Sequence, residues 1–293
     1  MSRDPIMETL STLRDLPTLP TVAVEIAALL DDPGSTSKQI MELMKTDQVL
    51  TSKVLRLVNS AYYGIPGGVT TVDRAISFLG YNTIFQLLIG VSVIEFSRVG
   101  GGGGLDIREF WKHSLGVAVT GEIIADRIGF ALAKETFAAG LLHDIGKVAL
   151  AKLAKERFGQ AVDAAKSRGV ELWRAEREQG LPTHDQVGSR LAELWRFPQN
   201  LRAAIGLHHK SHELRIQTAP RPLVPLLDIV VLANLLCRRF EIGDGGDSVI
   251  PELDRPLLAR LGLLESDVSQ VRGEIARKTE KSKVFLDLLG DDV

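Results

Sequence analysis

Five of the six histidines and one aspartate fall in segments with helical periodicity, in a pattern that a buried two-metal site would need. They are His113, the adjacent pair His143-Asp144, His184, and the adjacent pair His208-His209. Imidazole and carboxylate groups are the ligands that suit Fe, Mn, Zn or Ni. The sequence therefore predicts a centre for one or two divalent metal ions.

The pair His143-Asp144 lies in a strongly apolar segment, which we expect to form one helix over about 134–153. An ionised aspartate in such a helix is costly unless it is paired or bound to metal. Because adjacent helical residues point about 100° apart, Asp144 can bridge two ions while His143 binds one of them. Lys147 shares the face of His143. It is either a catalytic cation in the same cavity or an ordinary solvent-facing lysine.

Each histidine also has an ordinary interpretation. Taken singly, His113 and His184 can be hydrogen-bonded core residues. The pair His208-His209 can be a solvated helix end, where the helix dipole favours cations. The joint pattern favours the metal centre, and only His212 falls outside it, as an expected surface residue.

The composition is that of a folded globular protein. Of 293 residues, 45% are apolar and 25% are charged, which is enough for a substantial core. With 35 basic and 37 acidic residues, the chain lacks the field that would attract nucleic acid or an acidic membrane. Cys237 is the single cysteine, which excludes an internal disulfide and fits a reducing compartment. No signal peptide or membrane-length apolar run is evident, so we expect a cytoplasmic protein without nucleic-acid or membrane partners.

Apolar residues recur at helical spacing almost throughout, and alternating strand-like runs are scarce, so the predicted fold class is all-α. Capping boxes of Thr36 with Gln39 and of Thr183 with Gln186 mark two helix starts, and the second places His184 in a first turn. Asp106 is expected to cap another helix, which carries His113. Further helices are expected over about 49–58, 75–79, 83–96, 201–209, 224–240 and 265–278.

The clearest boundary in the sequence is an uninterrupted run of five glycines, Gly100 to Gly104. Such a run has no side chains to pack and much backbone entropy to lose, which is typical of a linker. The residues that follow lack the Lys and Ser or Thr of a phosphate-binding loop. The predicted organisation is an N-terminal helical subdomain (1–99), the linker (100–104), a metal-site subdomain (105–240) and a C-terminal helical tail (241–293).

Several motifs together resemble known families. The segment from His143 to Lys147, with the other histidines at their spacing, is similar to the HD superfamily of metal-dependent phosphohydrolases and to its cyclic-dinucleotide phosphodiesterase branch. The first half resembles the HDOD (HD-related output domain) family in the segments Leu16 to Pro20, Asp47 to Thr51, Leu55 to Gly64 and Ala75 to Gly80. The resemblance covers about 16–240, which would form one HDOD module.

The resemblance implies an all-helical output or regulatory element of bacterial signal transduction, with other signalling proteins as partners. It also implies that Asn234 stands where the HD superfamily has its last aspartate, and that the ligand set is His113, His143, Asp144, His184, His208, His209 and Asn234. Asp228, six residues before Asn234, would project about 120° away from it, so we do not expect it to reach the same ion.

Two functions stay open. The first is a regulatory HDOD module that retains a metal centre of structural or sensory use. The alternative is a metal-dependent phosphohydrolase or phosphodiesterase acting on a nucleotide or cyclic dinucleotide, in which Lys147 would stabilise the leaving phosphate and two ions would activate water. The amide at Asn234 and the absence of a Gly-Tyr-Pro segment after His208-His209 count against the enzyme.

Overall fold

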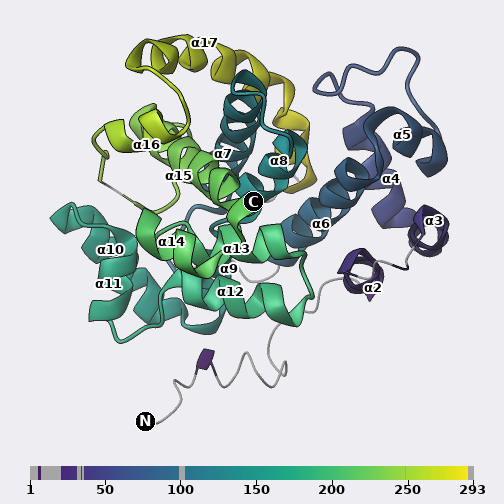
Figure 1. The fold of residues 1–293 in the computed structure, drawn as a ribbon. Helices are drawn as coiled ribbons and strands as arrows, with labels where there is room; N and C mark the ends of the chain where they lie inside the picture. Colours follow the sequence, from purple (N-terminus) through teal and green to yellow (C-terminus); the bar gives the residue numbers. More distant parts are fainter. Residues whose placement is uncertain are drawn as a thin grey trace.

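Helices make up all the regular structure that can be described. The computed structural model describes residues 6–7, 21–31, 34, 36–98, 103–247 and 249–289. Within these ranges every regular element is an α-helix or a short 3-10 helix (Figure 1). The predicted all-α fold class is therefore confirmed.

The first half of the chain forms a group of helices at one side of the molecule (Figure 1): α2 (Thr21–Asp31), α3 (Ser37–Thr46), α4 (Gln48–Val58), α5 (Val72–Leu79) and α6 (Tyr81–Arg98). The predicted capping box begins α3, where the backbone N–H of Thr36 donates to Gln39 Oε1 at 2.7 Å. After α4, the side chain of Asn59 bonds both backbone groups of Val69 at 2.7 and 2.8 Å. This clamp closes the loop that leads to α5.

The rest of the fold surrounds three central helices. The elements are α7 (Ile107–Arg127), α8 (Ala133–Leu142), α9 (Ile145–Leu153), α10 (Lys155–Arg168), α11 (Leu172–Glu178), α12 (His184–Leu194), α13 (Gln199–Leu207), α14 (His212–Thr218), η1 (Arg221–Leu223) and α15 (Val224–Arg239). Helices α7, α8 and α15 pack on one another. A Cβ added to Gly140 of α8 would lie 2.8 Å from the Cα of Ala118 in α7, so the close approach of these backbones requires glycine.

A second glycine contact joins α9 to α12. A Cβ at Gly146 would overlap the carbonyl oxygen of His184, and it would lie 2.8 Å from the backbone nitrogen of Gly188. The first turns of the two helices are therefore in backbone contact. Because His184 is the first residue of α12, this contact fixes the position of its backbone, from which the ring projects.

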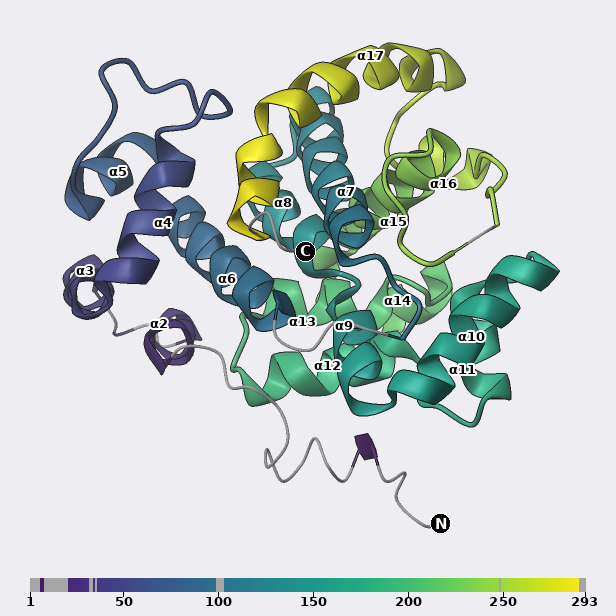
Figure 2. The same ribbon diagram turned by 180° about the vertical axis from the view of Figure 1, so that it is seen from behind.

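The C-terminal part returns to the first half. After α16 (Arg255–Arg260), α17 (Glu265–Lys281) runs beside α7, and η2 (Lys283–Leu289) packs on both α6 and α7 (Figure 2). The ring of Phe285 lies 6.4 Å from that of Tyr62 and 5.4 Å from that of Phe137. Tyr62 also donates a hydrogen bond to Glu122 of α7. The segment after α4 therefore packs at the junction between the halves.

The end of the glycine run is packed. Gly100 to Gly102 lie outside the described residues. A Cβ on Gly103, where φ is +70°, would lie 3.2 Å from Phe158 of α10 and 3.3 Å from the Cα of Ala151 in α9. The subdomain boundaries drawn around the run stay a prediction.

Among the described helices, no single one is long and apolar enough to cross a membrane. One pair, Val72–Leu79 with Tyr81–Ser97, passes the test of length and composition only when its members are joined, and it is bent by 118°.

Candidate metal centre

Separate elements deliver six of the seven predicted ligands to the middle of the fold. His113 lies in α7, His184 begins α12, and the pair His208-His209 follows α13 directly. The single helix expected over 134–153 is wrong. It breaks at the pair His143-Asp144, so that α8 ends at Leu142 and α9 begins at Ile145.

The break has a physical reason. Glycine on each side of the pair, Gly140 and Gly146, weakens a continuous helix, and each packs against a different neighbouring backbone. Asp144 occupies the cap position of α9, yet its carboxylate makes no cap hydrogen bond. The carboxylate is free to point at the histidine rings.

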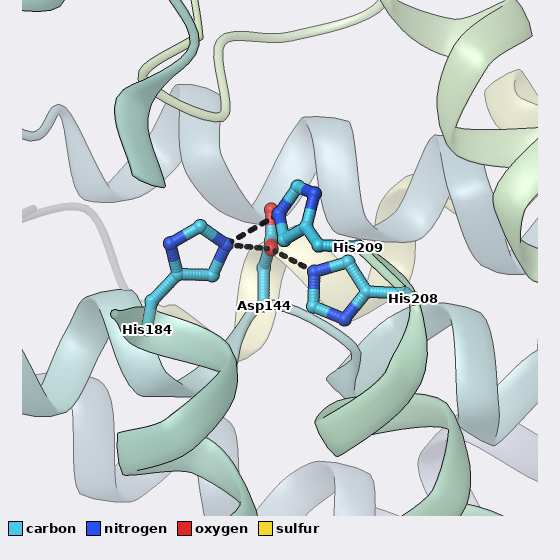
Figure 3. A group of neighbouring side chains, drawn as sticks. All are labelled: Asp144, His184, His208 and His209. Atoms are coloured by element: carbon cyan, nitrogen blue, oxygen red, sulfur yellow. Dashed lines mark hydrogen bonds and ion pairs between the residues drawn. The ribbon is translucent and has the colours of Figure 1, made fainter. Parts of the chain in front are cut away.

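Asp144 is the centre of the cluster. Its Oδ1 lies 3.4 Å from Nε2 of His184 and 3.3 Å from Nε2 of His208, and its Oδ2 lies 3.3 Å from Nε2 of His143. Figure 3 shows the rings of His184 and His208 turned toward the carboxylate from two sides, with His209 beside them. Nε2 of His209 lies 2.8 Å from Nε2 of His184.

These separations suit metal ligands. Zinc–nitrogen bonds are about 2.0–2.1 Å long, so two ligand atoms of one tetrahedral ion lie about 3.3 Å apart. Two groups of candidate ligands lie around Asp144: one with His184, His208 and His209, and one with His113 and His143. In each group the ligand atoms lie within 4.8 Å of one another.

Three atoms that face the cluster have no hydrogen-bond partner. They are Nε2 of His143, Nε2 of His208 and Oδ1 of Asp144, and all three residues are buried. Buried polar atoms are nearly always satisfied in folded proteins, so these orphans around one carboxylate need an explanation. A cation bound at Oδ1 would accept lone pairs from Asp144 and His208, whereas Nε2 of His143 lies on the other side, at Oδ2.

The far side of three of the rings is held by an acceptor. Nδ1 of His143 lies 2.8 Å from the carbonyl oxygen of Gly140, and Nδ1 of His208 lies 2.9 Å from that of Ile205. Nδ1 of His184 lies 2.8 Å from Oε1 of Glu176. In the neutral tautomer with the proton on Nδ1, these three rings present the Nε2 lone pair to the cluster, as in many metal sites.

Glu176 was not among the predicted site residues. It is completely buried, and it accepts the backbone N–H of His184 at 2.9 Å as well as bonding the ring. Burial lowers the pKa of His184, but the Glu176 carboxylate and the bond to Asp144 outweigh it and raise the pKa to about 10. Nothing in the charged segment around Glu176 signals this contact, because it forms only when α11 meets α12.

Burial lowers the pKa of three other histidines of the cluster. Burial is the main cause that lowers the pKa of His113 to about 4, with the neighbouring His143 adding to it. Burial also lowers the pKa of His208 and of His209. Burial alone would raise the pKa of Asp144, yet His143 and Lys147 hold it well below its usual range. Neutral imidazole beside an ionised carboxylate is the state that binds metal.

Lys147 faces the same cluster, and its alternative placement in solvent is wrong. Its side chain is 1% exposed, and its Nζ donates to Asp144 Oδ2 at 2.7 Å, to the carbonyl of Gly245 at 2.8 Å and to Asp247 Oδ2 at 2.9 Å. Burial lowers the pKa of Lys147, but the two carboxylates outweigh it and raise it above its ordinary value. The ammonium group of Lys147 is therefore held by acceptors of the protein itself.

Asp247 is the second residue that the sequence did not reveal. It lies in the loop after α15, which we call the glycine-aspartate loop (Gly243 to Asp247). Its Oδ1 accepts the backbone N–H of Leu172 at 2.8 Å. A signal was present in the run Gly-Asp-Gly-Gly-Asp, which is typical of a tight loop, but nothing in it indicates the partner.

The last three predictions concern polar residues around α15. Asn234 lies in this helix with its Oδ1 buried and without a hydrogen-bond partner, and its role as a ligand stays a prediction. Asp228 pairs with Arg215 and with Arg260, at 2.5 and 3.1 Å. His212 is half-buried, with Nδ1 3.4 Å from Asp228 Oδ1, and is less exposed than a surface residue.

Solved structures share this fold. An HDOD domain protein with unknown function from Geobacter sulfurreducens is 26% identical, with a TM-score of 0.76, and the match covers 97% of this chain and 96% of that chain. A candidate phosphohydrolase from Shewanella amazonensis SB2B is 24% identical, with a TM-score of 0.72, over 97% of this chain and 98% of that chain. The second likeness shows the fold alone.

A sequence relative and a family model also match this chain. An uncharacterized protein from Treponema pallidum is 24% identical over 246 residues, which are 84% of this chain and 46% of that protein. The chain thus spans about half the length of this curated relative. The family model of the HDOD domain matches residues 16–211, which is more than half of the chain. With the helical frame and the first-half motifs in agreement, the chain belongs to the HDOD family.

Proposed function

We propose that this chain is a regulatory module of the HDOD type in bacterial signal transduction, with a divalent metal ion held at Asp144. The observation that carries the proposal is a pair of buried, unpartnered atoms, Oδ1 of Asp144 and Nε2 of His208, which lie 3.3 Å apart beside the ring of His184. Family membership supports the regulatory part, and contacts with other signalling proteins belong to the same proposal.

The residues that would hold the ion are Asp144, His184, His208 and His209. Their chemistry fits Fe, Mn, Zn or Ni. Such an ion, when bound, supplies a Lewis acid that acidifies a coordinated water and polarises a phosphoryl oxygen. Glu176 orients His184 from behind, and burial lowers the pKa of three of the other rings.

A phosphohydrolase acting on a phosphorylated small molecule is the second candidate. A cavity of 350 Å³ beside the centre offers room for such a molecule; its lining holds Lys166 and Arg238 but also Glu241, Asp244 and Asp247. The bonding of Lys147 weighs against this candidate. This lysine would otherwise meet the phosphate, but it already donates to the carbonyl of Gly245 and to the carboxylate of Asp247.

The metal is tested by elemental analysis of protein purified without added metal. We expect bound Fe, Mn, Zn or Ni in the wild type and its loss in His184→Ala. The matched control is His212→Ala, which changes the one histidine outside the cluster and should keep the metal. A metal content near zero in the wild type would remove the centre from both candidate functions.

Activity separates the two functions. The metal-loaded protein is incubated with cyclic di-GMP and with simple nucleotides under reducing conditions, with Mn or Fe supplied. The regulatory function predicts no turnover with the site filled. Turnover that disappears in His184→Ala and persists in His212→Ala would instead favour the phosphohydrolase.

A further inference from the structure

The two ligand groups around Asp144 are not equivalent. Oδ1 faces His184 and His208 and has no hydrogen-bond partner, whereas Oδ2 faces His143 and already accepts a bond from Lys147. For the carboxylate to bridge two ions, Oδ2 would have to be available to the second ion. One side of the carboxylate is therefore open to a metal, and the other side carries a cation of the protein itself.

Resting on the proposed function, we infer that the centre takes a single divalent ion, held by Asp144, His184, His208 and His209, because the ammonium of Lys147 fills the place of a second one. An ammonium has three N–H donors. All three are used at 2.7 to 2.9 Å, on Asp144, Gly245 and Asp247.

The charges of the buried groups balance with one ion. Three carboxylates lie in or directly behind the cluster: Asp144, Asp247 and Glu176. Lys147 and one divalent ion together carry the same amount of positive charge. A second divalent ion beside Lys147 would leave two uncompensated positive charges in a buried site, which is costly.

The glycine-aspartate loop fixes Lys147 in this place. The loop is attached to α7, where the backbone N–H of Asp244 donates to the carbonyl of Glu109 at 3.0 Å. It also covers the ring of His113, since a Cβ on Gly245 would lie 2.9 Å from Cδ2 of that ring. His113, a ligand in the predicted set, is thus a packed neighbour of the loop.

The first test counts and locates the ion in the wild-type protein. Elemental analysis should give one ion per chain, and a metal-edge anomalous map of a crystal should show one peak, between Asp144, His184 and His208. Two ions per chain, or a single peak between His113 and His143, would overturn the inference and leave the proposed function standing. No bound ion would instead overturn the proposed function, and the inference with it.

Variants test the role of Lys147 directly. Lys147→Ala should raise the metal content from one ion to two, whereas Lys152→Ala, a change on the same helix α9, should leave one. A content of one in both variants would contradict the inference. Should Lys147→Ala fail to fold, the paired variants His113→Ala and His208→Ala decide, because we expect the first to keep one ion and the second to lose it. Loss of the ion in His113→Ala would contradict the single site.

Discussion

At the scale of single residues, the centre depends on side chains that hold other side chains. The carboxylate of Glu176 accepts hydrogen bonds from Nδ1 and from the backbone N–H of His184, and Glu176 is itself completely buried. A carboxylate behind a metal-binding imidazole fixes the ring orientation and raises its basicity. Glu176 is therefore a positioning residue, and it does not touch the expected ion.

Glu176→Gln should weaken metal binding without abolishing it. The amide keeps the shape but not the charge, and loss of such a partner typically costs about 10- to 100-fold in metal affinity. Competition titration with a metal chelator measures this. The control is Glu178→Gln on the same stretch, where the carboxylate is exposed and pairs with Arg168. Equal affinities in the two variants would show that Glu176 has no such role.

His113 predicts a pH dependence of stability in the metal-free protein. Its pKa is lowered from 6.5 to about 4 by burial, so between these values the unfolded chain binds a proton that the native state refuses. Stability from this group is therefore present above pH 6.5 and is lost as the pH falls toward 4, by up to about 3 kcal/mol.

Urea unfolding with a chelator present, at pH 7 and pH 5, measures this loss. His113→Phe should reduce the difference between the two pH values, while His212→Phe should not. A difference that stays unchanged in His113→Phe would assign the pH dependence to other groups.

Sequence reasoning found the histidines but not the groups that support them. Five of the six histidines and Asp144 lie together in the structure. They could be predicted because such residue types are unusual in apolar helices, which is visible in the sequence. Glu176 and Asp247 lie among ordinary charged or loop residues. Their partners, His184 and Lys147, are brought to them only by tertiary packing.

At the scale of elements, backbone contacts at glycine place the ligands. Gly140 lets α8 meet α7, and Gly146 lets α9 meet the first turn of α12. These contacts leave no room for a side chain. The positions of His143, Asp144 and His184 therefore follow from where whole helices touch.

Gly146→Ala should destabilise the protein strongly. The new methyl group would overlap the carbonyl of His184, and overpacking of this kind costs about 3 kcal/mol or more. The control is Gly273→Ala in α17, where nothing lies within 4 Å of an added Cβ and helix propensity predicts stabilisation by about 1 kcal/mol. Urea denaturation compares the two. A Gly146→Ala protein as stable as the wild type would disprove the contact.

The elements themselves were largely predictable. Caps at Thr36 and Asp106 and the capping residue Gln186 behave as the sequence indicates, because capping is local chemistry. The break at His143-Asp144 was missed because apolar periodicity continues across it. What interrupts the helix is the packing of Gly146 on α12, a contact with a residue far along the chain.

At the scale of the whole molecule, the C-terminal segment joins the two halves. Phe285 of η2 is buried against Tyr62, which follows α4, and Phe137 of α8. The salt bridges of Arg127 to Asp267 and to Glu274 bind α17 to α7. We therefore expect the halves to unfold together.

Phe285→Ala should cost about 3–5 kcal/mol, the usual range for a buried phenylalanine, and the unfolding should stay a single transition at lower urea. Tyrosine and tryptophan fluorescence, which report on the first half and on the rest of the fold, should coincide. The control is Phe78→Ala, where the ring is 52% exposed and the change should fall within about 0.5 kcal/mol. Two separate transitions in the wild type would contradict the joint core.

The glycine contacts at Gly140 and Gly146 carry a consequence for how this lineage changes over time. Both contacts are made by main-chain atoms, so exchange of a ligand imidazole or carboxylate in a descendant leaves them in place. Substitution of a metal ligand is then tolerated more easily than substitution of either glycine. Relatives with eroded ligand sets should still keep small residues at these two crossings, and a collection of such sequences would reveal whether they do.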